Sequence, residues 1–223
     1  MRIVIAGGHG QIALRLARLL EGRGDQPVGL IRRAEHEHDL RAIGAEPVLL
    51  DLESAKRDEV AAVLEGAGAV VFAAGAGPGS GAERKDSVDR AAAVLLADAA
   101  QAAGVRRYLM ISSMGADANS AYDGDPTFRA YLRAKGAADD DLRSRSGLDW
   151  TILRPGSLRN EPGTGRVLLA EHTGRGSVPR DDVAAVLAEL LAAPGTAGLT
   201  LELIAGDVPV HEAVAAVASA AAG

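Results

Sequence analysis

The chain has 223 residues, of which 48% are hydrophobic and 24% are charged, and its 24 Lys plus Arg against 30 Asp plus Glu give a formal net charge of −6. A length of this order fits one α/β domain with a single core. The acidic balance and the 3% aromatic content argue against a nucleic-acid-binding protein, which needs basic surface and rings that stack on bases, and leave small-molecule chemistry as the expected role.

Two further features of the composition bear on the compartment. The chain has no cysteine, which excludes disulfides, thiolate nucleophiles and Cys-based metal sites and favours a reducing compartment, the cytoplasm. The most apolar helix-like run, Val183 to Ala193, is interrupted by Glu189 and is too short to span a bilayer. We therefore expect no membrane association, a small-molecule substrate, and a monomer or a small homo-oligomer.

In chain order, short runs rich in Val, Ile and Leu alternate with longer segments of helical period. Strands are expected at Arg2–Ala6, Gln26–Arg32, Glu46–Leu50, Ala69–Ala74, Tyr108–Ser112, Asp149–Leu153 and Leu199–Ile204. Helices are expected at Gly10–Glu21, Lys56–Glu65, Glu83–Ala103, Phe128–Ser146, Arg180–Ala192 and Val210–Ala220. Continuous apolar runs are typical of parallel strands that are buried on both faces and joined by right-handed helical crossovers.

This pattern predicts a single α/β domain over residues 1–223, a doubly wound, mostly parallel sheet with helices on both faces. Residues 115–127 and 155–176 are dense in Gly, Pro, Asn, Asp and Ser, and we expect them to be loops. In a doubly wound sheet such segments follow the carboxyl ends of strands, where ligands bind. We interpret residues 156–223 as a small C-terminal elaboration that forms one wall of a substrate cleft.

The first expected strand is followed by the sequence GGHGQIA, with Gly7, Gly10 and Ala13 spaced three apart. A pyrophosphate needs free backbone N–H groups at a helix N-terminus, no side chain where the backbone approaches it, and a small residue where helix meets strand. The motif meets all three needs and opens a βαβ unit, so we predict a dinucleotide site. Its residues would be Gly7, Gly8, His9, Gly10, Gln11 and Ile12, with His9 acting through its backbone.

The end of the second strand bears on the choice of dinucleotide. A chain that binds NAD usually places an acid here to hold the ribose hydroxyls, but Ile31 is followed by Arg32 and Arg33. Two guanidinium groups would attract a 2′-phosphate, so we predict a preference for NADP(H) over NAD(H); alternatively, both arginines are solvated residues at a strand end. Asp51 is placed to accept a hydrogen bond from the adenine amino group, or else caps the next helix.

A tyrosine and a lysine four residues apart, Tyr131 and Lys135, lie on one expected helix. Residues at i and i+4 share a helix face, so the ammonium can lie beside the phenol. A nearby positive charge favours the phenolate form and makes a tyrosine a usable proton donor and acceptor. Ser112 and Ser113 end the fifth strand, and one hydroxyl could orient a substrate carbonyl. The alternative is an amphipathic helix with a packed phenol and a solvated amine.

Several short motifs together resemble the short-chain dehydrogenase/reductase superfamily, specifically its atypical NAD(P)H-binding branch that includes biliverdin reductase B-like proteins. The resemblance covers nearly the whole chain. It depends on the order and spacing of GGHGQIA (7–13), Asp51-Leu52, FAAG (72–75), SVDRAAA (87–93), RRYLMISSMGA (106–116), YLRAK (131–135), WTILRPG (150–156) and VPRDDVA (178–184).

The resemblance implies a Rossmann-like domain that binds NADP(H). It implies that Tyr131 is the proton donor, that Lys135 assists it and binds the cofactor ribose, and that Ser113 or Ser112 orients the carbonyl. The turn at Ala73–Gly75 would lie near the ribose, and Pro155-Gly156 beside the nicotinamide. The other cofactor-binding residues it implies are Leu52, Ala73, Ala74, Gly75 and Ile111.

Two departures from the superfamily pattern keep several functions open. The only asparagines, Asn119 and Asn160, lie in expected loops, so the helical asparagine of the usual proton relay is missing.

The leading hypothesis is an NADPH-dependent oxidoreductase that passes hydride to a small carbonyl or conjugated acceptor. The alternative is a non-catalytic NADP(H)-binding redox sensor. A nucleotide-sugar epimerase or dehydratase would need retained NAD, against which the arginine pair argues, and a longer C-terminal part.

His36 and His38 invite a metal interpretation, since histidine is a common metal ligand. Ligands at i and i+2 on a short polar segment with no third ligand nearby are usually solvated. We therefore expect no metal site.

Overall fold

The computed structural model describes residues 1–77 and 79–221, so that Pro78 and the last two residues of the predicted 1–223 domain lie outside the described part. The strands of the main sheet are β1 (Arg2–Ala6), β2 (Gln26–Ile31), β3 (Glu46–Leu49), β4 (Ala69–Phe72), β5 (Arg107–Ile111), β6 (Asp149–Pro155), β8 (Arg166–Ala170), β10 (Leu199–Ala205) and β11 (Val208–Pro209). Within this part they form one sheet of nine strands, in the order β11-β8-β10-β6-β5-β4-β1-β2-β3. β7 (Ser157–Arg159) pairs with β9 (Ser177–Pro179) in a second, two-stranded sheet.

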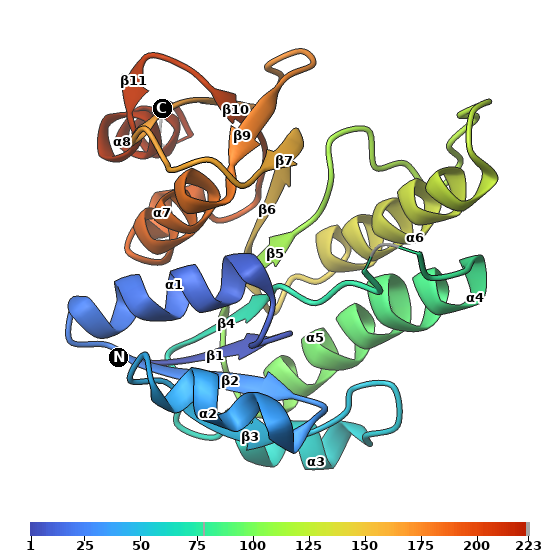
Figure 1. Cartoon of the computed structure of the whole chain (residues 1–223), viewed down its shortest axis with the longest axis vertical. Helices are drawn as coiled ribbons and strands as arrows, with labels where there is room; N and C mark the ends of the chain where they lie inside the picture. Colours follow the sequence, from blue (N-terminus) through green and yellow to red (C-terminus); the bar gives the residue numbers. More distant parts are fainter. Residues whose placement is uncertain (78, 222–223) are drawn as a thin grey trace.

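Helices cover both faces of the main sheet (Figure 1). One face packs against α1 (Gln11–Gly22), α7 (Arg180–Leu191) and α8 (Val210–Ala220). The other face packs against α3 (Arg57–Leu64), α5 (Ala92–Ala102) and α6 (Pro126–Arg143). The shorter helical pieces are η1 (Ala34–His36), α2 (Glu37–Arg41), α4 (Ala82–Arg84), the π-helix η2 (Lys85–Ala91) and η3 (Pro194–Thr196).

The first strand explains why the apolar runs are continuous. Successive side chains of a strand point to opposite faces of the sheet. In β1, Ile3 and Ile5 enter the hydrophobic cluster on the α1 and α7 side, whereas Val4 and Ala6 enter the cluster on the α3 and α5 side. Both faces of β1 are therefore buried, and an alternating polar pattern would be costly there.

The order of the strands creates a crevice next to β1. From β1 the chain passes through α1 to β2 and β3, and then returns through α3 to β4 on the other side of β1. The loops that leave β1 and β4 therefore diverge at the carboxyl ends of these strands. Crevices at such a topological switch point are where ligands bind in doubly wound sheets.

The structure confirms the predicted fold class, a doubly wound and mostly parallel sheet with helices on both faces and a smaller C-terminal elaboration. Two local predictions were wrong, and one segment with no predicted element is helical. Residues 155–176 contain β7 and β8 rather than only loop, because β8 pairs antiparallel to β10 and turns Val167 and Leu169 inward. The helix predicted at 83–103 is divided by the π-helix η2, and residues 34–41 form η1 and α2.

Much of the C-terminal part belongs to the main layers rather than to a wall. Strand β10 pairs in parallel with β6, and α7 is buried beside α1. The smaller elaboration consists of β7, β8, β9 and β11. Among the described residues, no helix is both long and apolar enough to cross a membrane.

Candidate functional site

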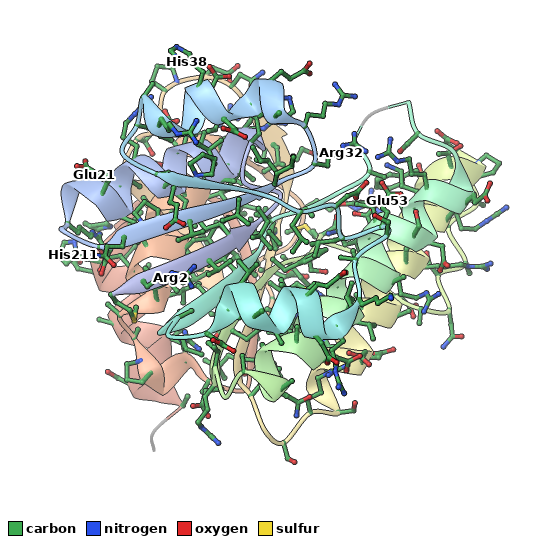
Figure 2. The ribbon with its side chains drawn as sticks, turned by 90° about the horizontal axis from the view of Figure 1, so that it is seen from below. Arg2, Glu21, Arg32, His38, Glu53 and His211 are labelled. Atoms are coloured by element: carbon green, nitrogen blue, oxygen red, sulfur yellow. The ribbon has the colours of Figure 1, made fainter. Side chains whose placement is uncertain are left out.

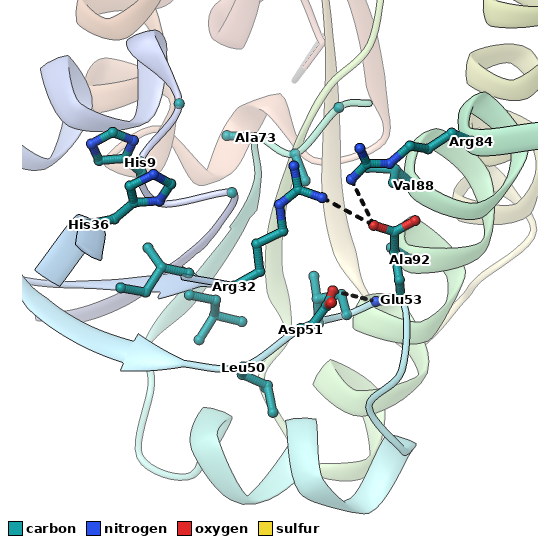
Figure 3. Close-up of a pocket in the computed structure, with 17 residues that line it drawn as sticks. His9, Arg32, His36, Leu50, Asp51, Glu53, Ala73, Arg84, Val88 and Ala92 are labelled. Carbon is teal, nitrogen blue, oxygen red and sulfur yellow. Dashed lines mark hydrogen bonds and ion pairs between the residues drawn. The ribbon is translucent and has the colours of Figure 1, made fainter. Parts of the chain in front are cut away.

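A cavity of about 280 Å³ opens at the carboxyl ends of β1, β2 and β4 (Figure 3). Nine of the residues that line it were singled out from the sequence: Gly7, His9, Gly10, Arg32, Asp51, Leu52, Ala73, Ala74 and Gly75. Eight further lining residues were not predicted to bind the cofactor: Leu30, Ile31, His36, Leu50, Glu53, Arg84, Val88 and Ala92. The structure thus brings together the glycine turn, the end of β2, the loop after β3 and the loop after β4.

The glycine turn presents the positive end of α1 to this cavity. Gly7 has a φ of 74°, and a Cβ added to it would lie 2.6 Å from the Cα of Ala74. The first hydrogen bond of the helical ladder runs from Leu14 N–H to the Gly10 carbonyl, so the N–H groups of Gln11, Ile12 and Ala13 precede it. The helix has no side-chain cap and no acidic residue in its first turn. An anion can therefore approach these N–H groups.

Gly8 has a different task from the glycines on either side of it. It is buried, donates its N–H to the Leu30 carbonyl at 2.9 Å, and would place a Cβ 2.6 Å from the Cα of Gly29. It therefore lets the turn pack against β2 and does not line the cavity. Gln11 and Ile12 likewise do not line it with their side chains, because Gln11 is exposed and Ile12 is buried in the core.

The two arginines after β2 are separated by the structure. Arg32 lines the cavity and its Nη1 lies 3.4 Å from Oε2 of Glu53, the same oxygen that Nη2 of Arg84 approaches at 2.9 Å. Glu53 also accepts a hydrogen bond from the hydroxyl of Ser87. Arg33 does not line the cavity and instead pairs with Glu35 at 3.2 Å. Figures 2 and 3 show Arg32 and Glu53 at the same open end of the sheet.

The wall formed by the loop after β3 is mainly apolar. Leu50 and Leu52 of this loop line the cavity, together with Val88 of η2. Asp51 is exposed and its Oδ1 accepts the N–H of Glu53 at 3.0 Å, which fixes the turn that carries both carboxylates. A flat apolar space next to an exposed carboxylate suits a nucleobase with an exocyclic amino group.

Two histidines stack at the opposite side of the cavity. The rings of His9, in the glycine turn, and His36, in η1, are 3.7 Å apart between centroids and inclined by 5°. Nε2 of His9 lies 2.7 Å from Oδ2 of Asp39. Burial, and the nearby charge of His9, lower the pKa of His36 below its ordinary value. The sequence analysis considered His36 only as a possible metal ligand with His38 and did not predict its place at this cavity.

Behind Gly75, the cavity is connected to the helix that carries Tyr131 and Lys135. Asp89, fully buried on η2, accepts the N–H of Ala76 at 3.3 Å, and its Oδ1 lies 3.3 Å from Nζ of Lys135. Nζ of Lys135 also donates to the Ile111 carbonyl at 3.0 Å. The ammonium is therefore held at the carboxyl end of β5. Asp89 belongs to the SVDRAAA motif, but the sequence analysis predicted no role for it.

Tyr131 lies partly exposed between an aromatic ring and a cation. The centroid of the Tyr131 ring is 5.8 Å from that of the Phe128 ring. Nζ of Lys85 lies 5.2 Å from the same Tyr131 centroid. Lys85 is itself buried and donates to the Gly77 carbonyl at 2.9 Å. The cation that the structure places over the Tyr131 ring is thus Lys85, which the sequence analysis did not single out.

The two serines after β5 have different surroundings. Ser112 is buried and donates its hydroxyl to Oδ2 of Asp139 at 2.9 Å, and the same oxygen accepts Nε of Arg154 at 2.8 Å. Burial raises the pKa of Asp139, although Arg154 and Ser112 act in the opposite direction. Ser113 is partly exposed and donates to the Met114 carbonyl at 3.3 Å.

Pro155 and Gly156 lie at the end of β6, beside the serines. The carbonyl of Pro155 accepts the N–H of Met114 at 3.0 Å. A Cβ added to Gly156 would lie 2.4 Å from the Gly176 carbonyl oxygen. The structure does not place Ile111, Ser112, Ser113, Tyr131, Lys135, Pro155 or Gly156 in the lining of the cavity described above. The strand-end residues 111–113 and 155–156 lie side by side because β5 pairs with β6, and Lys135 reaches them through the Ile111 carbonyl.

Comparison with known proteins agrees with this geometry. The sequence profile of the NAD(P)H-binding family matches residues 7–194. The chain belongs to this family, in the atypical branch of the short-chain dehydrogenases/reductases. It is 37% identical over 215 residues to a Bacillus subtilis protein named as an uncharacterized sugar epimerase, YhfK, a match that covers 96% of this chain and 99% of the relative.

Two solved structures are similar over nearly their whole length. One, from Bacillus halodurans, is provisionally named an NAD-dependent epimerase/dehydratase; it shares 38% identity and a TM-score of 0.88, covering 97% of this chain and 99% of that one. The other is ChuY, named as an anaerobillin reductase of Escherichia coli O157:H7, with 26% identity and a TM-score of 0.78, covering 93% and 98% of the two chains.

The residues present fit the cofactor of this family. A Cβ at Gly7 would enter the backbone of the loop after β4, so the turn keeps its close approach only with glycine. The uncapped N-terminus of α1 suits a diphosphate, and the apolar wall beside Asp51 suits an adenine ring.

Proposed function

We propose that the protein is an NADPH-dependent oxidoreductase that transfers hydride to a small carbonyl or conjugated acceptor. The observation that carries this proposal is the continuity of the site: Gly75 lines the cavity at the glycine turn, and Asp89 beneath it pairs with Lys135. A dinucleotide held by the turn would extend from the cavity toward Tyr131 and Ser113. The name of the similar reductase ChuY supports the same reaction class.

Each part of the site has a proposed role in binding. The N–H groups of Gln11, Ile12 and Ala13 hold the diphosphate, and Asp51 accepts the adenine amino group. An ammonium has three donors, so the contacts of Lys135 with Ile111 and Asp89 leave one for a ribose hydroxyl. Arg32 and the adjacent histidines recognise the 2′-phosphate, which is the basis for a preference for NADP(H).

The chemistry divides between cofactor and protein. The bound cofactor supplies the hydride. Tyr131 donates a proton to the substrate oxygen as negative charge develops there, and Lys85 over its ring favours the resulting phenolate. Ser113 orients the substrate carbonyl, since Ser112 already donates to Asp139. Phe128 and Tyr122, whose rings are 5.2 Å apart, form an apolar side of the substrate pocket.

A binding titration combined with a substrate screen tests this function. NADPH fluorescence should report tighter binding than NADH, and NADPH oxidation should be detectable with at least one quinone, flavin, aldehyde or ketone. Tyr131→Phe should lower kcat by about 10²-fold or more while leaving NADPH binding unchanged. Tighter NADH binding would contradict the cofactor preference, and an undiminished rate in Tyr131→Phe would contradict the role of the phenol.

A second candidate is an NAD-dependent epimerase or dehydratase. It is favoured by the names of the Bacillus subtilis relative and the Bacillus halodurans structure, which are 37% and 38% identical to this chain. Such an enzyme regenerates its cofactor within each turnover and keeps it bound. Purified protein that carries NAD and consumes no NADPH would favour it, whereas tight NADPH binding without any turnover would favour a redox sensor.

A further inference from the structure

The stacked pair His9–His36 is not explained by the packing of the fold. His9 is a turn residue beside a cavity, and a glycine-rich turn has no structural need for an imidazole. The side chains of His9 and His36 are 31% and 23% exposed, so both rings remain accessible to a ligand. Figure 3 shows them together on one side of Arg32, with Glu53 and Arg84 on the other.

Each imidazole of the pair has a carboxylate nearby, but the one beside His36, Glu35, is also paired with Arg33. Asp39 on α2 lies 2.7 Å from His9, and the hydrogen bond with His9 holds the pKa of Asp39 below its ordinary value, so this carboxylate stays ionised. The charge of His38 also lowers the pKa of Asp39. Oε1 of Glu35 lies 3.7 Å from Nε2 of His36 and raises the pKa of His36, whereas the charges of His9 and Arg33 lower it. Burial and His9 dominate, and the pKa of His36 is lowered.

The arginines near the cavity are already paired with carboxylates. Arg33 is engaged with Glu35 outside the cavity, and Arg32 shares the Glu53 carboxylate with Arg84. On the side of the cavity that His9 and His36 occupy, the groups that can supply positive charge to an incoming anion are therefore the imidazoles. In the part of the chain that the structure describes, no group of three or more His, Asp or Glu could hold a metal ion instead.

We propose that His9 and His36 form a protonation-coupled site for the 2′-phosphate of NADP(H), in which the pair takes up a proton when the phosphate binds. This inference rests on the proposed NADPH preference and goes beyond it, because it assigns the recognition to the histidine pair as well as to Arg32. A dianionic phosphate next to His36 offsets the repulsion from His9 and favours the imidazolium, which then donates a charge-assisted hydrogen bond.

The direction of the pH dependence follows from linkage. A group whose proton affinity rises on binding makes the complex more stable at low pH, so NADPH affinity should fall as pH rises. The phosphate itself is dianionic above about pH 6, so the range from about pH 6.5 to about pH 8.5 isolates the imidazoles. Over that range the dissociation constant for NADPH should increase by about tenfold, whereas that for NADH should change little.

Isothermal titration calorimetry in two buffers of different ionisation enthalpy measures the proton uptake directly and needs no turnover. At about pH 7 the protein should take up close to one proton with NADPH and close to none with NADH. His36→Asn and His9→Asn should each remove most of the NADPH-linked uptake and weaken NADPH binding, with little effect on NADH. His38→Asn is the matched control in the same segment, since His38 is exposed on α2 (Figure 2), and it should retain the uptake.

The outcomes separate this inference from the proposed function. NADPH binding without proton uptake, or uptake that persists in both His9→Asn and His36→Asn, would overturn the inference and leave the NADPH-binding function standing. Binding of neither dinucleotide would overturn both. If the variants fail to fold, NMR of the imidazoles in the unaltered protein decides: NADP⁺ but not NAD⁺ should move His36 toward the protonated form.

Discussion

Ser112 and Ser113 are neighbours in sequence, but their surroundings give them separate tasks. Ser112 is buried and its hydroxyl donates to Asp139, whereas Ser113 is partly exposed at the end of β5, where Lys135 donates to the Ile111 carbonyl. We expect Ser112→Ala to lower the free energy of unfolding by about 1–3 kcal/mol, because it removes a donor from a buried carboxylate. Ser113→Ala should instead lower kcat by about 10²-fold with little change in stability.

Urea unfolding and steady-state NADPH oxidation measure these two effects in parallel. The pair of variants is its own control, since each loses one hydroxyl of the same size. Loss of turnover in Ser112→Ala with unchanged stability would reverse the assignment of the serines.

Gly7 and Gly24 both adopt a positive φ but differ in what surrounds them. A Cβ at Gly7 would lie 2.6 Å from the Cα of Ala74, while the space around Gly24, with a φ of 80°, is open. Gly24→Ala should therefore cost only the backbone strain, about 1 kcal/mol of unfolding free energy. Gly7→Ala should displace the turn from the loop after β4 and weaken NADPH binding by about tenfold or more.

Fluorescence titration of both alanine variants checks this expectation, with thermal unfolding to separate binding from stability. Equal NADPH affinity in Gly7→Ala and the parent protein would show that the turn does not approach the ligand.

At the scale of elements, the π-helix η2 contacts both the cavity and α6. Its seven residues turn Lys85, Val88 and Asp89 inward, so that one short segment contributes to the cavity wall, to the Tyr131 ring and to the pairing of Lys135. Insertions of this type in α-helices are frequent at functional sites.

Asp89→Asn tests this arrangement. The change leaves the buried ammonium of Lys135 without its carboxylate, and breaking such a pair from one side is expected to lower the free energy of unfolding by about 3–5 kcal/mol. The double variant Asp89→Asn with Lys135→Met should recover most of this loss, because it removes both charges. Urea unfolding of the four proteins gives the coupling; a double variant no more stable than Asp89→Asn would contradict an electrostatic origin.

Elements that follow local patterns could be predicted from the sequence, and those that depend on contacts between distant segments could not. The alternation of apolar runs and helical segments predicts the sheet, and GGHGQIA predicts the turn at Gly7, because both are local signals. Strand β8 forms by pairing with β10 and β11, and Asp89 of η2 pairs with Lys135, 46 residues along the chain. The placement of Glu53 between Arg32 and Arg84 likewise joins three separate loops.

At the scale of the whole molecule, the two halves of the chain are connected across the α1 and α7 layer. Arg23, directly after α1, donates to Glu189 of α7 and to the Ala188 carbonyl, and Arg15 of α1 donates to Asp181 at 2.5 Å. The first helix thus contacts a helix more than 150 residues later, and both pack on the sheet beside the glycine turn. The position of the turn therefore depends on the C-terminal part of the chain.

The Arg15–Asp181 contact gives this connection a pH dependence. The hydrogen bonds from Arg15 and from the Gly163 N–H lower the pKa of Asp181 below its ordinary value of 3.8. A carboxyl group of this kind contributes stability that is present above its unfolded pKa and is lost as pH falls through the lower folded pKa.

Asp181→Asn should therefore reduce the free energy of unfolding at neutral pH, by only about 0.5 kcal/mol because both side chains are partly exposed and screened. The difference from the parent should shrink as pH falls below 3.8 and should also shrink in about 1 M salt. Urea unfolding at a series of pH values measures it, and a difference that grows toward acid pH would contradict the assignment of this contact.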